Sequence, residues 1–295
     1  MKALIIGGNR FFGLQLARLL VAEGHTVTLL NRGNNDDGLG DKVDRICCNR
    51  IDQKAMKDQV EDCHWDVVFD QVCFDYDQAK SVCEVFEGKT NRVVFTSSMS
   101  VYDWGEEIQE DLFDPYSYTF RSKATQFSDY SEAKRQAEVA YFRYAKFPVT
   151  AVRLPIVFGQ DDYTGRFAFH VEHILNDEPM FFPKLDAKLS LIRSDIAAEL
   201  LFRLSIIEFE GPLNIACGDP LSLQEYMELI ENNLNKKMIL SEVAVEEATS
   251  PWGVPNHWTL SLAKARSLGL PTPNIKNAFV ETLKTLNLPD IDPEL

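Results

Sequence analysis

The order of hydrophobic and polar residues in the first half of the chain repeats as strand, then helix. Short apolar runs predict strands at residues 2–6, 27–30, 43–47, 67–70, 92–96 and 149–154. Apolar residues spaced three and four apart predict helices at 12–23, 53–60, 76–86 and 129–146. Parallel strands need a crossover, which a helix supplies. The pattern therefore predicts an α/β fold, a doubly wound parallel sheet with helices on both faces.

After Pro155 the alternation is less regular. Helices are expected at 166–176, 195–207, 221–233 and 277–286, short strands at 189–192, 213–216 and 238–240, and a loop at 249–258. We expect one domain at 1–158 and a smaller mixed α/β C-terminal domain at 159–295, with 189–207 packing back on the first. A ligand is expected between the two domains, at the carboxyl ends of the strands.

A glycine-containing turn joins the first strand to the first helix. It reads Gly7-Gly8-Asn9-Arg10-Phe11-Phe12-Gly13. Gly7 permits the tight turn, Gly13 lets helix and sheet approach closely, and the helix N-terminus offers unpaired N–H groups to a pyrophosphate. The turn predicts that 1–158 is a dinucleotide-binding domain and 159–295 a substrate domain. Arg10 stands where such a turn normally has its middle glycine, and we expect its side chain to help hold phosphate.

The end of the second strand indicates which dinucleotide is bound. Enzymes that use NAD commonly have an acidic residue here, which binds the adenosine ribose hydroxyls. This chain has Asn31, which carries no charge to repel a 2′-phosphate, and Arg32, which can pair with one. The two residues favour NADP over NAD as cofactor. The alternative is that Arg32 is a solvated turn residue and that the protein takes NAD.

A serine, a tyrosine and a lysine form a candidate catalytic set. Ser98 follows the strand at 92–96, and Tyr130 and Lys134 lie in the helix predicted at 129–146. Positions four apart share a helix face, so Tyr130 and Lys134 project together. Lys134 can stabilise a phenolate and hold a nicotinamide ribose, and Tyr130 can then remove a proton from a substrate hydroxyl as hydride leaves the carbon. A serine at the strand end would bind the same oxygen.

Charge and composition exclude several other classes of protein. The 295 residues include 30 basic and 45 acidic side chains, a formal net charge of −15, with no obvious basic patch to bind nucleic acid. No apolar stretch approaches the roughly 20 residues that span a bilayer, and the first apolar run ends at Ile6, too short for a signal peptide. The six cysteines have no metal-binding spacing and are expected to be free thiols. We expect a cytoplasmic protein with no membrane partner.

These motifs together resemble those of the extended short-chain dehydrogenases/reductases, in particular the NAD-dependent epimerase/dehydratase family. The resemblance covers nearly the whole chain and implies a Rossmann-type fold and an NAD(P)-dependent enzyme. It rests on Gly7-Gly8-x-x-x-x-Gly13, Thr96-Ser97-Ser98-x-x-Val101-Tyr102, Tyr130-x-x-x-Lys134 followed by Glu138, Arg153-Leu154-Pro155 with Phe158-Gly159, Asp195-Ile196-Ala197, and the segment 260–270.

The resemblance also implies a set of site residues. Ser98, Tyr130 and Lys134 would be the catalytic set. The residues expected to bind the cofactor are Gly7, Gly8, Asn9, Arg10, Phe11, Phe12, Gly13, Asn31, Arg32, Asn49, Arg50, Asp70, Gln71, Val72, Thr96, Tyr130, Lys134, Pro155 and Val157. Cys73 would lie beside the cofactor, where we expect a buried spacer rather than an accessible thiol.

The residues that follow Ser98 indicate which of the family's reactions this chain can catalyse. Sugar-nucleotide 4,6-dehydratases place an Asp-Glu pair just after the strand's serine or threonine, where this chain has Met99 and Ser100. Neither can act as a general acid or base near neutral pH, which disfavours elimination, and decarboxylation is disfavoured for the same reason. Reversible oxidation at one carbinol carbon remains. We expect a sugar-nucleotide epimerase-like enzyme or, alternatively, an NADPH-dependent carbonyl or keto-sugar reductase.

The basic residues that would bind a substrate diphosphate differ from those usual in the family. Family members that act on nucleotide diphospho-sugars usually carry an arginine seven residues before the aspartate that matches Asp195, and this chain has Lys188 there. A second arginine, expected before the C-terminal signature, is missing from 249–259. A diphosphate needs local cations, which Arg166, Lys188 and Arg193 could supply, with Lys184. Ser100 completes the expected substrate contacts.

Two alternatives concern partners. The arginine-containing glycine turn also resembles a subgroup that includes chloroplast stem-loop RNA-binding proteins, so an RNA-binding or regulatory cofactor-binding protein on the same fold is the competing hypothesis. The net charge of −15 and the intact catalytic set argue against it. Family members often pair through the helix of the tyrosine and lysine and the helix before the serine strand. The resemblance therefore implies a homodimer that pairs through 129–146 and 76–86.

Overall fold

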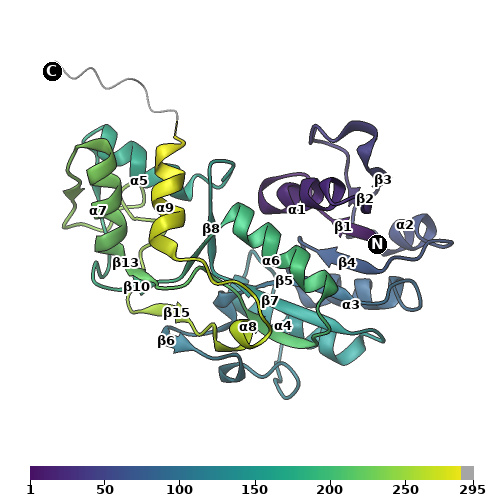
Figure 1. The fold of residues 1–295 in the computed structure, drawn as a ribbon. Coiled ribbons are helices and arrows are strands. Elements are labelled where there is room, and N and C mark those ends of the chain that lie inside the picture. Colours follow the sequence, from purple (N-terminus) through teal and green to yellow (C-terminus); the bar gives the residue numbers. More distant parts are fainter. Residues whose placement is uncertain (287–295) are drawn as a thin grey trace.

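A parallel sheet of seven strands forms the centre of the fold (Figure 1). The computed structural model describes residues 1–286. Across the sheet, the strands lie in the order β12-β7-β5-β4-β1-β2-β3. They are β1 (Lys2–Ile6), β2 (Thr26–Asn31), β3 (Asp44–Cys47), β4 (Val67–Asp70), β5 (Val93–Ser98), β7 (Val149–Leu154) and β12 (Gly211–Asn214). The order reverses between β1 and β4, and a crevice is expected at that point, outside the carboxyl ends of the strands.

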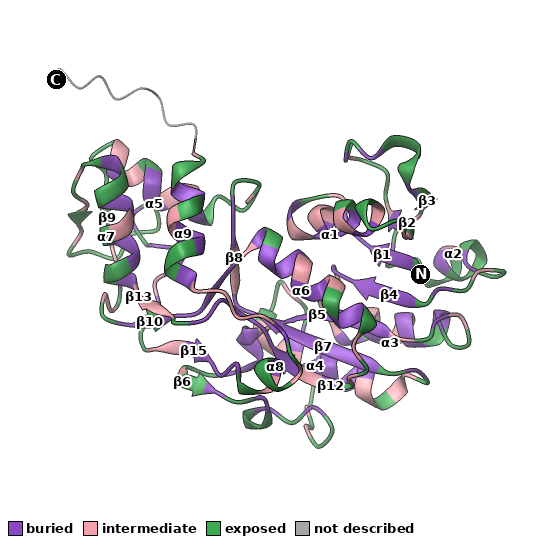
Figure 2. Cartoon of the chain, in the orientation of Figure 1, coloured by how far each residue is buried: buried purple, intermediate pink, exposed green. Residues whose placement is uncertain are grey.

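Helices cover both faces of this sheet. They are α1 (Phe11–Ala22), α2 (Gln53–Gln59), α3 (Tyr76–Val85), α4 (Tyr130–Tyr144) and α6 (Ser194–Ile206). Successive residues of a strand point to opposite faces. Accordingly Ile5 packs in one buried cluster with α1 and α6, and Leu4 packs in a second with α3 and α4. Figure 2 shows the result, a buried sheet whose helices are buried on the inner side only.

The C-terminal part is smaller and mixed. Its helices are α5 (Arg166–Leu175), α7 (Leu223–Leu234), α8 (Ala263–Ser267) and α9 (Ile275–Lys284). One sheet of four strands has the order β13 (Leu221–Ser222), β10 (Lys188–Leu189), β15 (Trp258–Leu260), β6 (Gly105–Ile108). Two pairs complete it: β8 (Ile156–Phe158) with β11 (Leu191–Arg193), and β9 (Pro179–Met180) with β14 (Ile239–Leu240).

The two parts of the chain exchange elements. The strand β6, from the first part, joins the smaller sheet, whereas β12 adds the seventh strand to the large one. The helix α6 packs against α1. The first buried cluster accordingly extends from Leu16 of α1 to Phe279 of α9. No helix within residues 1–286 is both long and apolar enough to cross a membrane.

Most of the predicted elements of the large sheet are present, with ends that differ by a few residues. The prediction was wrong at 189–192, which is two strands that pair in different sheets, β10 and β11, separated by Ser190. It was also wrong at the end of the 249–258 loop, since Trp258 begins β15. Both errors have one cause. These strands are only two or three residues long, and an alternation of apolar and polar residues cannot be recognised over so short a segment.

Candidate active site

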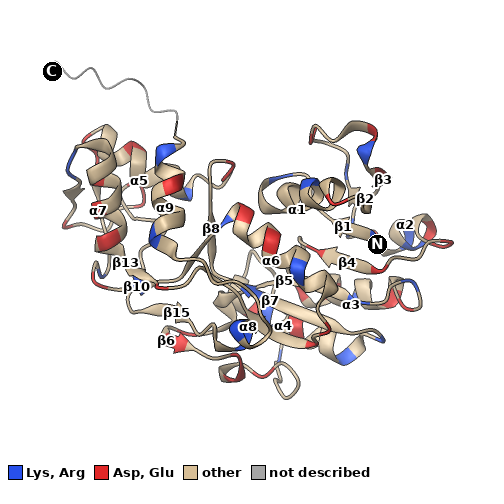
Figure 3. Ribbon diagram, viewed as in Figure 1, with Lys and Arg blue, Asp and Glu red and all other residues tan. Residues whose placement is uncertain are grey.

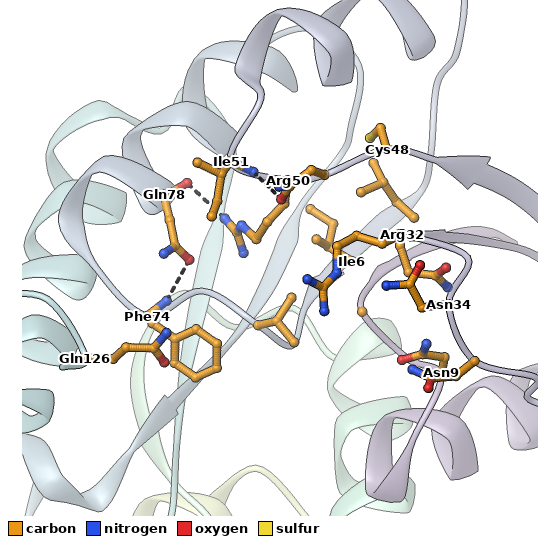
Figure 4. A pocket seen from close by; sticks show the side chains of 16 residues that line it. Ile6, Asn9, Arg32, Asn34, Cys48, Arg50, Ile51, Phe74, Gln78 and Gln126 are labelled. Atoms are coloured by element: carbon orange, nitrogen blue, oxygen red, sulfur yellow. Dashed lines mark hydrogen bonds between the residues drawn. The ribbon is translucent and has the colours of Figure 1, made fainter.

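Two adjoining cavities lie at the carboxyl ends of the central strands. The first has a volume of about 300 Å³ and is lined by the ends of β1 and β2 and by 48–51 (Figure 4). The second has about 500 Å³ and is lined by the end of β5, by α4 and by 154–157. Val72 and Phe74 line both. The two cavities therefore adjoin, and together they make up one cleft.

The glycine turn lies beside the first cavity, which Gly7 lines, and requires glycine at three positions. Gly7 and Gly8 have φ of +98° and +72°, in the region that side chains disfavour. A Cβ on Gly8 would lie 2.6 Å from Cγ2 of Ile5, and one on Gly13 would lie 3.0 Å from Cα of Gly8. The helix α1 that follows has no side-chain cap and no acidic residue in its first turn. Its N-terminus is therefore well suited to an anion.

Arg10 lies at the rim of the cleft and lines neither cavity. Its Nη2 donates to Oδ1 of Asn35 at 2.6 Å, and its Cζ lies 5.5 Å from the centre of the Tyr163 ring. Asn35 lines the first cavity and Tyr163 the second. Arg10 thus connects the two rims. Of the other turn residues, Asn9 lines the first cavity, and Phe11 and Phe12 line the second.

The first cavity carries positive charge and, among the described residues, no carboxylate lines it. Asn31, Arg32, Asn49 and Arg50 all contribute to its wall. Asn31 uses Oδ1 to accept from the backbone N–H of Gly33 at 2.8 Å. Arg32 is exposed and has no hydrogen bond or salt bridge to any residue of 1–286, and Figure 4 shows its side chain extending into the cavity. Acidic residues are distributed over both parts of the chain, so their absence here is a local feature (Figure 3).

Arg50 is held from behind by a buried carboxylate. Its Nη1 donates to Oδ1 of Asp70 at 2.6 Å, and the Tyr141 hydroxyl donates to Oδ2 of Asp70 at 2.5 Å. Burial alone would lower the pKa of Arg50, but the Asp70 carboxylate outweighs it and raises this pKa above its ordinary value. Asp70 lines neither cavity. Asp70 therefore lies behind Arg50 and holds its side chain. The sequence had suggested that Asp70 itself lines the cleft.

Ser98, Tyr130 and Lys134 all line the second cavity. The Nζ of Lys134 is buried, donates to the carbonyl oxygens of Cys73 and Thr96 at 2.7 and 2.8 Å, and lies 5.9 Å from the centre of the Tyr130 ring. Tyr130 begins α4, directly after the Asp129 cap, and is 41% exposed. The Ser98 Oγ accepts from the backbone N–H of Ser100 at 3.1 Å.

A second buried carboxylate fixes α4 against β5. Glu138, one turn beyond Lys134 on α4, accepts from the Ser97 hydroxyl at 2.5 Å and from Nη2 of Arg153 at 2.6 Å. Glu138 and Arg153 are fully buried. Since Ser97 precedes Ser98 on β5, this network sets the register between the strand that carries the serine and the helix that carries the tyrosine and lysine.

Several buried polar atoms in cleft-lining residues have no hydrogen-bond partner. They are Nε of Arg50, both amide atoms of Gln71, the hydroxyls of Thr96 and Ser100, and the indole Nε1 of Trp258. Most buried polar groups in proteins are paired, so these atoms have hydrogen-bonding capacity left for a polar ligand or for water. Together with the glycine turn and the acid-free cavity, they fit a dinucleotide lying along the strand ends.

The remaining expected cofactor residues also lie in the cleft. Val72, Pro155 and Val157 line the second cavity. Cys73 is fully buried, and burial, with the nearby Asp70 charge, raises its pKa to about 12, so it is a spacer with an unreactive thiol. Sequence reasoning missed the aromatic wall of Phe74, Tyr163 and Trp258. These residues lie outside or at the start of regular elements, where no periodic pattern marks them.

The structure brings only two of the expected substrate residues to the cleft, Ser100 and Arg166. Arg193 is bound instead by Asp195, at 2.6 and 2.8 Å, and by Glu281, at 2.7 Å. Lys188 is exposed on β10 and lines neither cavity. Lys188 and Arg193 therefore line neither of the two cavities.

Residues 3–180, more than half of the chain, match the NAD dependent epimerase/dehydratase family. The chain belongs to this family. Membership confirms the prediction of an enzyme of the extended short-chain dehydrogenase/reductase type, whose members depend on NAD. The glycine turn and the candidate catalytic residues Ser98, Tyr130 and Lys134 all fall within the matched residues.

Solved structures show that the fold is shared along nearly the whole chain. The UDP-glucose 4-epimerase of Thermus thermophilus, in complex with NAD, is 16% identical, with a TM-score of 0.75, over 96% of this chain and 98% of that one. A UDP-glucuronic acid 4-epimerase from Bacillus cereus is 15% identical, with the same TM-score and coverage. A dTDP-glucose 4,6-dehydratase from Bacillus anthracis is 14% identical, with a TM-score of 0.75 over 96% of each chain.

One curated relative is described as a binding protein and not as an epimerase or dehydratase. The chloroplast stem-loop binding protein of 41 kDa b from Arabidopsis thaliana is 33% identical over 132 residues. The match covers 39% of this chain and 35% of the relative, so the chain spans about a third of that relative's length.

Proposed function

We propose that this enzyme binds NAD or NADP along the strand ends and catalyses reversible oxidation at one carbinol carbon of a sugar-type substrate, as an epimerase-like enzyme. One observation carries the proposal: Ser98, Tyr130 and Lys134 line a cavity that adjoins the acid-free cavity beside the glycine turn. The residues for acid–base chemistry and those for holding a dinucleotide thus share one cleft.

The roles of the three residues follow from their surroundings. Tyr130, half-exposed to the cleft, acts as the general base for the substrate hydroxyl and returns the proton as general acid. Lys134 is held by the carbonyl oxygens of Cys73 and Thr96, and its charge stabilises the phenolate. Ser98 has its hydroxyl oriented by the N–H of Ser100 and binds the substrate oxygen. The bound nicotinamide supplies the site that accepts and returns hydride.

We propose NADP as the preferred cofactor. Arg32 has no partner within residues 1–286 and extends into the first cavity, where no carboxylate opposes a 2′-phosphate. Asn31, its neighbour, is neutral and engaged with Gly33. An unpaired guanidinium in an acid-free cavity attracts a phosphate group.

The test is a calorimetric titration with NAD, NADH, NADP and NADPH, followed by turnover assays. Binding of NADP more tightly than NAD is expected. Assays of sugars and simple carbonyls then separate the two reactions, because an epimerase isomerises its substrate without net cofactor change and a reductase consumes NADPH stoichiometrically. No binding of any of the four forms would remove the proposal.

The stem-loop binding relative supports a second candidate function, RNA binding on the same fold. The net charge of −15 opposes it, since phosphate contacts supply most non-specific affinity for nucleic acid. Salt-dependent retention of the protein on stem-loop RNA, with no nicotinamide binding, would favour this candidate over the enzyme.

A further inference from the structure

The helix α5 begins at the wall of the second cavity and presents an arginine there. Its first residue, Arg166, lines the cavity together with Thr164. The Arg166 side chain is exposed and has no hydrogen bond or salt bridge within residues 1–286. Gly165 caps the helix with φ of +70° and offers no side chain to the first turn. A free guanidinium beside an uncapped helix N-terminus favours an anion.

The rest of this cavity has little charge to offer. No Asp or Glu of the described chain lines it, and its other cation is Lys134. Lys134 is buried among the carbonyl oxygens of Cys73 and Thr96, next to the Tyr130 ring. Arg166 is therefore the one cation in the described wall that is free to bind an anionic group of the substrate.

The cations that a diphosphate needs lie elsewhere. Arg193 is neutralised by Asp195 and Glu281, and Lys188 is outside the cleft. The second cavity, of about 500 Å³, must in addition hold the nicotinamide half of the cofactor. The two phosphates of a nucleoside diphosphate sugar would meet a single unpaired cation, Arg166, in the described wall of this cavity, which favours a substrate with one anionic group.

The remaining wall suits a sugar ring. Tyr163, Pro251 and Trp258 line it, and the Trp258 indole is held by an edge contact to Trp104, with ring centres 4.5 Å apart. Flat aromatic faces pack against apolar C–H surfaces. The hydroxyls of Ser98 and Ser100, also in the wall of this cavity, complement hydroxyl groups.

We propose, on the basis of the function proposed above, that the substrate is a polyhydroxylated compound with a single anionic group held by Arg166. That group is a phosphate monoester or a carboxylate. The aromatic wall packs against the carbon skeleton, and Ser98, with Tyr130, receives the reacting hydroxyl.

The test uses the full chain saturated with NADP or NAD, after the cofactor titration has shown binding. The probes are ribose 5-phosphate, glucose 6-phosphate, glucose 1-phosphate, gluconate and glucuronate, with UDP-glucose as the competing class. At least one single-anion probe should bind more tightly than UDP-glucose. The phosphates and the carboxylates together identify which anion is preferred.

Two variants locate the anion site. Arg166→Gln should weaken the best single-anion probe by about 10-fold or more, the usual effect of losing a charge-assisted hydrogen bond. Arg121→Gln, at an exposed arginine that lines neither cavity, is the matched control and should leave binding unchanged. Cofactor affinity should be the same in both variants.

Three results would overturn this proposal: tighter binding of UDP-glucose, no binding of any single-anion probe to the loaded protein, or equal binding by Arg166→Gln and wild type. Each leaves the proposed reversible oxidation at a carbinol carbon standing, because cofactor binding has been measured first. Failure of the cofactor titration itself would instead remove the proposed function.

Discussion

The buried Nζ of Lys134 lies 5.9 Å from the centre of the Tyr130 ring, one turn away on the same helix. The same nitrogen donates to the carbonyl oxygens of Cys73 and Thr96. Cys73 follows β4, and Thr96 lies on β5, the neighbouring strand of the sheet. Lys134 thus connects the tyrosine to the strand ends, and the two residues are expected to act as a unit.

Replacement of Lys134 should impair binding and chemistry together. Lys134→Met removes the charge beside Tyr130 and both hydrogen bonds to the strand ends, so cofactor affinity and turnover should each fall by about 10-fold or more. Titration calorimetry and single-turnover kinetics measure the two effects. Circular dichroism and thermal unfolding confirm that the variant is folded. Normal cofactor affinity in a folded variant with reduced turnover would contradict the binding role.

Arg32 should determine the choice of cofactor. Arg32→Gln removes the unpaired guanidinium of the first cavity, so NADP affinity should fall by about 10- to 100-fold while NAD affinity changes less than about twofold. Arg121→Gln serves again as the exposed control. Equal losses for NADP and NAD would mean that Arg32 does not contact a 2′-phosphate.

Arg10 should slow the release of the cofactor. It bridges Asn35 and Tyr163 across the rims of the two cavities. Arg10→Gly restores the residue usual in such a turn and removes the bridge, so the dissociation rate of NADP should rise by about 10-fold. Stopped-flow displacement measures this rate. Tyr163→Leu removes the stacking contact alone and should give a smaller increase; unchanged rates in both variants would rule out the bridge.

Much of the cofactor half of the site could be predicted from the sequence because its signals are local. Gly7, Gly8 and Gly13 lie within one turn, and Tyr130 and Lys134 lie four apart on one helix. The substrate half depends on contacts between distant segments. Arg193 is bound by Glu281, 88 residues away, and no local pattern reports such a pair. The same holds for Asp70, whose partners Arg50 and Tyr141 come from other elements.

The domain boundary at residue 158 and the homodimer stay predictions. The faces of α3 and α4 that would pair are partly covered by the segment 113–129 of the same chain. Phe120 packs on Tyr76, with ring centres 5.4 Å apart, and Lys123 forms an ion pair with Asp77. If a dimer forms through this face, light scattering at tens of micromolar should give twice the chain mass. Charge reversal with Lys80→Glu on α3 should then weaken the dimer; a monomer in the wild type would dispose of it.

The central claim is that Tyr130 is the acid–base group of an NAD(P)-dependent enzyme, and Tyr130→Phe tests it most directly. The phenol is half-exposed to the cleft, so its loss should leave the fold and the cofactor affinity nearly intact. Turnover of the best substrate should fall by about 100-fold or more, the usual effect of removing a positioned acid or base. The measurement is the ratio of single-turnover rates of wild type and variant at saturating cofactor. A ratio of 100 or more with unchanged cofactor binding is the predicted result, and a ratio near one would contradict the account.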